Sequence, residues 1–139
     1  MRNIQSVSQL HALQNETFVY AAIVAILIFV VALLVANAIP YQGGLIDRSY
    51  IKRRIGLAVS VTIGALGFWL YNDLYVMSFV KKVAFQHQFS VTNLQCLGIT
   101  VIGSLVLSFI IMLAFPNSKF GSILGKAKNV VNKKNVVNN

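Results

Sequence analysis

The side chains that could carry out chemistry in this sequence are few and far apart. Its acids are Glu16, Asp47 and Asp73, and its histidines are His11 and His87. The two histidines lack the spacing of metal ligands, so we interpret them as unrelated surface residues. No Ser-His-Asp arrangement and no G-x-S-x-G motif accompanies the serines. The sequence therefore predicts neither an enzyme nor a bound metal or cofactor.

Asp73 is the acid nearest to an uninterrupted apolar segment. It is either a helix-end carboxylate at a membrane interface or a vestibule acid paired with Lys81 or Lys82. Cys96 is the only cysteine, which excludes an internal disulfide and a cysteine-based metal cluster. The apolar segments themselves contain no Asp, Glu, Lys, Arg or His, so proton relays and ion-coupled transport, which use such charges, are not expected.

The composition identifies the class of protein that must position these residues. Of 139 residues, 57% are hydrophobic and 11% are charged, whereas about a quarter of a soluble domain is charged. Twelve Lys and Arg residues face three acids, which gives a net charge of +9. In an apolar chain this excess favours a bilayer with anionic headgroups as the partner, and we expect no nucleic acid. We predict an all-α integral membrane protein.

Three apolar runs are long enough to cross a bilayer, which requires about 20 residues of helix. The first begins with too few basic residues and is too long for a cleavable signal peptide. The predicted transmembrane helices are residues 18–39, 55–72 and 96–115. The predicted connecting segments are an external N-terminal segment 1–17, a basic cytoplasmic loop 40–54, an external segment 73–95 and a basic cytoplasmic tail 116–139.

The basic residues predict the orientation of the three helices. Three lie on the side of the N-terminus, and nine lie on the side of the 40–54 loop and the tail. The positive-inside rule then places the N-terminus outside and the C-terminus in the cytoplasm of a cell (inner) membrane. The nine residues predicted to anchor the chain on anionic lipid are Arg48, Lys52, Arg53, Arg54, Lys119, Lys126, Lys128, Lys133 and Lys134. The aromatic residues predicted to lie at the interfaces are Tyr20, Tyr41, Trp69, Tyr71 and Tyr75.

Two segments outside the predicted spans allow two interpretations each. Residues 74–95 form either an interfacial amphipathic helix, with Val76, Phe79, Val80 and Val83 on one face, or a helical extension of the second span. The tail is either solvated and partly disordered, or a docking strip for anionic lipid, an acidic partner or nucleic acid, although no aromatic residue beyond Phe120 supports base stacking.

Small residues repeat every three or four positions along the second and third spans, where they let helix backbones approach closely. They either pack the three helices together or form a seam between molecules. These predicted helix-packing residues are Gly56, Ser60, Gly64, Gly67, Thr100, Ser104 and Ser108.

These features predict a non-enzymatic subunit that anchors or stabilises a larger membrane assembly of the secretion, conjugation or respiratory type. Its partners would be other membrane subunits or copies of itself. Two alternatives remain. In plan, the chain is similar to three-span phage holins, which implies a self-assembling pore with Thr100, Ser104 and Ser108 as its lining. An oligomeric passive channel is the other.

Overall fold

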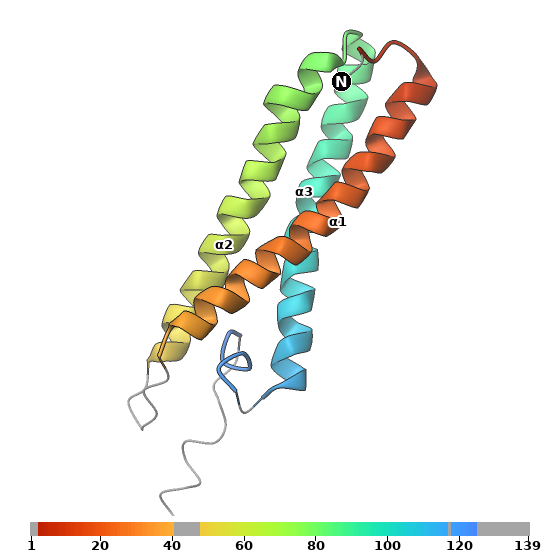
Figure 1. Cartoon of the computed structure of the whole chain (residues 1–139). Helices are drawn as coiled ribbons and strands as arrows, with labels where there is room; N and C mark the ends of the chain where they lie inside the picture. The colour runs from red at the N-terminus through yellow and green to blue at the C-terminus, as the bar shows by residue number, and fades with distance from the viewer. Residues whose placement is uncertain (1–2, 41–47, 117, 125–139) are drawn as a thin grey trace, which may run out of the picture. The chain divides into compact units, whose positions relative to one another are not determined.

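The computed structural model describes residues 3–40, 48–116 and 118–124. Its helices are α1 (Val7–Ala38), α2 (Ser49–Tyr71) and α3 (Val83–Ala114), shown in Figure 1. A π-helical turn (Asn72–Val76) and a 3-10 turn (Met77–Phe79) extend α2. The three helices are long and apolar enough to cross a membrane. For the described residues, the predicted all-α class with three long apolar helices is confirmed.

Helix α1 begins well before the apolar run that predicted it. Ser6 and Gln9 form a reciprocal cap, in which Ser6 Oγ accepts from the N–H of Gln9 at 3.3 Å and Gln9 Oε1 accepts from the N–H of Ser6 at 3.2 Å. Such a capping box satisfies backbone donors that have no partner at a helix start. Residues 7–17, predicted as an external segment, are therefore helical and continuous with the first apolar run.

The predicted interfacial helix between the second and third spans is not present, and its residues extend the two neighbouring helices instead. Val80 has an extended backbone, and α3 starts at Val83. Val76 and Val80 are buried, because the N-terminal segment covers them: Ile4 forms a β-bridge with Val80, and its N–H donates to the carbonyl of Phe79 at 2.9 Å. Of the segment 74–95, residues 74–79 thus extend the second span, whereas residues 83–95 belong to α3.

The described chain divides into two compact units, and each helix contributes a part to both. The first unit comprises Met1–Leu27 and Thr62–Gly103. Its apolar cluster brings together Leu10 of α1, Val76 of the π-helical turn and Phe89 of α3. Elsewhere in this unit the buried side chains are small, for example Ala21 on α1 and Ala65 on α2.

The second unit comprises Ile28–Val61 and Ser104–Asn139. Its buried residues on α1 and α2 recur at helical spacing, so each helix turns one face inward. The buried residues of this unit are Ile28, Ala32 and Ala36 on α1, Ser49, Arg53, Leu57 and Val61 on α2, Ser104 and Ser108 on α3, and Gly121, Ser122 and Ile123 beyond α3.

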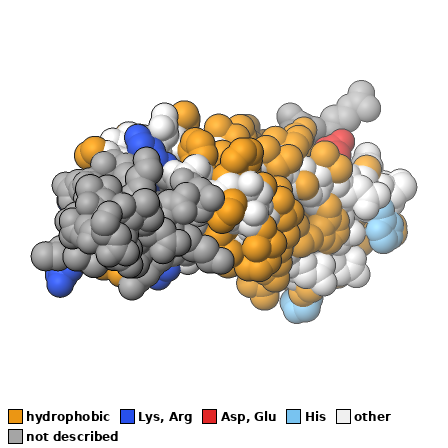
Figure 2. All heavy atoms as spheres, turned by 90° about the horizontal axis from the view of Figure 1, so that it is seen from below, with side chains coloured by type: hydrophobic (Ala, Val, Ile, Leu, Met, Phe, Trp, Pro, Cys, Tyr) orange, Lys and Arg blue, Asp and Glu red, His pale blue; other side chains and the backbone are white. Residues whose placement is uncertain are grey.

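Most of the apolar surface faces outward. In the most apolar 18-residue window of each helix, only 22% of the residues are buried inside the chain. Large side chains such as Leu34, Ile63 and Leu113 are more than 60% exposed. Figure 2 shows hydrophobic side chains over much of the described surface. A bilayer or partner helices can cover such a surface, whereas water cannot do so favourably.

Candidate functional site

Arg53 connects three parts of the second unit although it is only 1% exposed. Its Nε donates to the carbonyl oxygen of Ala36 at 3.2 Å, and its Nη2 donates to that of Ile39 at 3.1 Å. The first carbonyl belongs to the last turn of α1, and the second belongs to the residue that follows α1. Its Nη1 donates to Ser122 Oγ at 2.6 Å. One guanidinium on α2 thus binds the end of α1 and the segment that follows α3.

Pro40 explains why Ala36 needs this donor. In an uninterrupted helix, the carbonyl of residue 36 accepts from the N–H of residue 40, but proline has no N–H. Arg53 supplies the missing hydrogen bond. Lys119 acts on the same turn, since its Nζ donates to the carbonyl of Asn37 at 3.2 Å. Cations near a helix C-terminus are also favoured by the helix macrodipole.

The segment from Ser118 to Leu124 packs against the protein as a series of turns. Ser122 and Ile123 are each 1% exposed. A Cβ added at Gly121 would overlap the backbone of Phe115 and Pro116, so the turn requires glycine at this position. The prediction of a solvated tail is therefore wrong for residues 118–124, because the basic side chains hold them. Residues 125–139 lie outside the described part of the chain.

The predicted anchoring residues do not all have the same environment. Arg48 and Lys52 are exposed. Arg54 is also exposed, and its Nη2 donates to the carbonyl of Leu124 at 2.8 Å while its Cζ lies 5.2 Å from the ring centre of Tyr50. Arg53 differs from these residues, because its guanidinium is buried against protein oxygens. Lys126, Lys128, Lys133, Lys134 and the aromatic Tyr41 lie outside the described residues.

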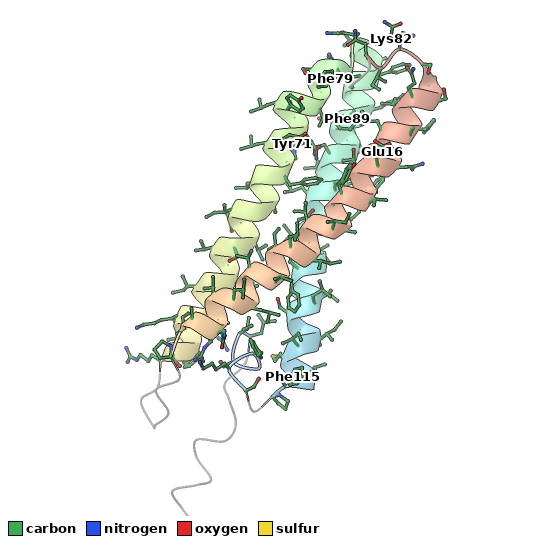
Figure 3. All side chains as sticks on the ribbon, in the orientation of Figure 1. Glu16, Tyr71, Phe79, Lys82, Phe89 and Phe115 are labelled. Atoms are coloured by element: carbon green, nitrogen blue, oxygen red, sulfur yellow. The ribbon has the colours of Figure 1, made fainter. Side chains whose placement is uncertain are left out.

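Three of the predicted interfacial aromatic residues are about half exposed, namely Tyr20, Tyr71 and Tyr75. The ring centres of Tyr71 and Tyr75 are 5.3 Å apart, and Tyr75 makes an edge contact with Phe79 at the same distance. Figure 3 labels Tyr71 and Phe79, the two ends of this row. Trp69 is half-buried. Their location at a membrane interface remains a prediction.

Two buried asparagines lie in the first unit, and the sequence interpretation did not single them out. Asn93 on α3 is fully buried, and its Nδ2 donates to the carbonyl of Trp69 at 3.1 Å. Its Oδ1 has no hydrogen-bond partner among the described residues. Asn72, at the start of the π-helical turn, is 4% exposed, and its Nδ2 also has no partner there. An amide inside an apolar stretch was the signal that could have identified both.

Replacing Asn72 by leucine is expected to raise the free energy of unfolding by about 1 kcal/mol, because a buried donor without a partner costs about 1–3 kcal/mol. Unfolding in detergent, followed by far-UV circular dichroism, measures the change. Thr92→Val is the matched control. It removes the hydrogen bond that Thr92 accepts from Gln14 Nε2 at 2.9 Å and should destabilise the chain. A loss of stability in Asn72→Leu would contradict the prediction.

The predicted helix-packing residues of α2 fall into two groups. Gly56, Ser60 and Gly64 are half-buried. A Cβ added at Gly56 would lie 2.7 Å from Val35 Cγ1, so α1 and α2 approach closely there. Ser60 Oγ donates to the carbonyl of Gly56 at 2.8 Å. Gly67, in contrast, is exposed, and a Cβ added there would meet no atom within 4 Å.

The predicted polar stripe of α3 is buried inside the chain. Thr100, Ser104 and Ser108 are each 0% exposed. Thr100 Oγ1 donates to the carbonyl of Cys96 at 2.8 Å, and Ser108 Oγ donates to that of Ser104 at the same distance. Satisfying a hydroxyl within its own helix is the usual solution in an apolar environment. These residues are used for packing within the molecule.

The titratable residues are scattered in the described chain. Asp73 makes no ion pair with Lys81 or Lys82, and the Lys82 Nζ lies 5.0 Å from the ring centre of Phe85 instead. No three His, Cys, Asp or Glu side chains of the described residues are close enough together to hold a metal ion. Comparisons with protein-family models, with curated proteins and with solved structures found no match. The features that stand out in the described residues are the helix junction held by Arg53 and Lys119 and the outward-facing apolar surface.

Proposed function

We propose that this chain is a non-enzymatic subunit of a larger assembly in the cell (inner) membrane. It associates with other membrane subunits, or with copies of itself, through an outward surface that includes Gly67. The observation that carries this proposal is the contrast between two glycines of one helix. At Gly56, Val35 of α1 packs closely against α2, whereas Gly67 is exposed and a Cβ added there would meet no atom within 4 Å. A glycine without a neighbour on an apolar helix leaves room for a backbone from another molecule.

The outward apolar surface supports the membrane location. Lipid provides little hydrophobic drive for helices to associate, so packing at small residues and hydrogen bonds must supply it. The proposed orientation has the N-terminus outside and the C-terminus in the cytoplasm, with Arg48 and Lys52 at the anionic headgroups. Its support is the nine-to-three distribution of basic residues. A C-terminal tag that external protease removes from intact cells would overturn the orientation.

Native sizing after gentle detergent extraction tests the association. The wild type should elute as an oligomer or with co-purifying subunits, and Gly67→Leu should shift it towards the monomer. Ala58→Leu is the control, since Ala58 is also exposed on α2 but lies nine residues away, about half a turn around the helix. A wild type that is strictly monomeric at native expression levels would refute the subunit proposal. Equal elution of the two variants would exclude Gly67 from the interface.

The holin-like pore and the passive channel are less well supported. Both need Thr100, Ser104 and Ser108 to face a water-filled path, but all three are fully buried in the single chain. The helices would have to separate before these hydroxyls could line a lesion. Controlled expression distinguishes the cases, because a pore former should collapse the membrane potential abruptly, whereas a subunit should leave growth unaffected.

A further inference from the structure

A groove of about 350 Å³ lies in the first unit between the beginning of α1 and the end of the α2 extension. Four of its residues are on one face of α1, at the i, i+3, i+4 and i+7 spacing that places side chains side by side. The lining residues are Ile4, Gln9, Ala12, Leu13 and Glu16 from the N-terminal part, and Val76 and Phe79 from the α2 extension. Figure 3 labels Glu16 and Phe79, one from each wall.

The groove keeps its form because both walls are tied in place. The bridge between Ile4 and Val80 holds the N-terminal segment against the α2 extension. Gln9 is held by its two capping hydrogen bonds, to the N–H groups of Gln5 and Ser6. Ala12 has a short side chain and leaves space between its larger neighbours. The groove is thus part of the folded unit.

Its chemistry is apolar with a single negative charge. Ile4, Leu13 and Phe79 supply hydrophobic walls, and Glu16 is the only acid in the lining. In a chain of net charge +9 this carboxylate is unusual. Among the described residues no basic side chain pairs with it. The groove therefore favours a ligand that carries a cationic group.

The place of Glu16 in the sequence indicates which ligand this is. It immediately precedes the charge-free run from Thr17 to Ile46, so it would lie at headgroup depth if α1 spans the bilayer as proposed. Lipids with an ethanolamine headgroup offer a primary ammonium at that depth, joined to apolar chains. Anionic lipids would be repelled by the carboxylate. We propose that this groove binds the ammonium headgroup of a phosphatidylethanolamine-type lipid on the external face, an inference that rests on the proposed membrane location.

Native mass spectrometry of the purified full-length chain in detergent tests the inference. The probes are dihexanoyl-phosphatidylethanolamine and, for comparison, dihexanoyl-phosphatidylglycerol. The wild type should retain the ethanolamine lipid preferentially. Glu16→Gln should weaken its binding about fivefold or more, as expected for loss of a charge-assisted hydrogen bond. Ala12→Trp, which fills the groove, should abolish the preference without removing any charge.

Asp73→Asn is the matched control, because Asp73 is the other described acid of this unit and does not line the groove. It should bind like the wild type. Equal retention of the two lipids by the wild type, or unchanged binding in Glu16→Gln, would overturn the inference. Both outcomes are separable from failure of the membrane proposal, which a chain that stays dispersed in buffer without detergent would show.

Discussion

Replacing Arg53 by methionine is expected to release residues 118–124 and to lower the free energy of unfolding by about 3 kcal/mol. The substitution keeps an apolar stem but removes three donors, to the Ala36 carbonyl, the Ile39 carbonyl and Ser122 Oγ. Hydrogen bonds from a charged donor contribute about 1.5–3 kcal/mol each, and partners left buried lose their solvation as well. Water that enters the opened junction can bind the two carbonyls and Ser122 Oγ, so the loss of stability is smaller than the sum of the three hydrogen bonds.

Two measurements check this result. Unfolding in detergent gives the change in the free energy of unfolding. Limited trypsin digestion at Lys119 reports release of residues 118–124. Cleavage should be at least about tenfold faster, because its rate follows the population of the opened form. Lys52→Met is the control. It removes one positive charge from the adjacent, exposed position. It therefore reduces the excess of basic residues on the predicted cytoplasmic side as much as Arg53→Met does. Identical behaviour of the two variants would mean that Arg53 contributes only its charge.

Gly56→Leu is expected to destabilise the junction of α1 and α2 by about 2 kcal/mol, within the range for overpacked cores. The first added carbon would lie 2.7 Å from Val35 Cγ1. A helical valine has one strongly preferred rotamer, so Val35 cannot turn aside and the two backbones must separate. Detergent unfolding of the monomeric chain measures the effect.

Two further variants make this prediction specific. Gly67→Leu adds the same side chain to the same helix at an open position, and it should leave the stability of the monomer unchanged or raise it by under about 1 kcal/mol. Val35→Ala introduced together with Gly56→Leu should restore part of the loss, because the two residues are in contact. A double variant as unstable as the sum of the single variants would disprove the close approach at this site.

The number and class of the helices could be predicted from particular features of the sequence. No charged residue occurs from Thr17 to Ile46, and only a helix satisfies the backbone in such an apolar run. The helix ends were less predictable. The Ser6–Gln9 capping box starts α1 and is visible in the sequence, but apolar length alone does not detect it. The end of the α2 extension at Phe79 depends on Ile4, which is distant in the chain.

The candidate sites were predictable to a smaller extent. The small-residue spacing identified Gly56 and Gly67 together, yet one contacts Val35 and the other contacts nothing. The burial of Asn72 and Asn93 was not predicted, because asparagine is in most proteins an exposed residue. The groove beside Glu16 is formed by the beginning of α1 and the end of the α2 extension, which are about 60 residues apart in the sequence, so no local pattern predicts it.

By itself, the sequence determined that this chain has three apolar helices and an uneven distribution of charge, because hydropathy and charge are properties of each residue and add along the chain. Only the tertiary structure decided what the charges do. In the sequence, Arg53 is one of nine similar basic residues. In the folded chain, Pro40 cannot donate an N–H to the Ala36 carbonyl, so Arg53 donates to it, and Ser122 Oγ lies within hydrogen-bond distance of the same guanidinium. Such a role depends on contacts between distant residues, which are set by packing rather than by composition.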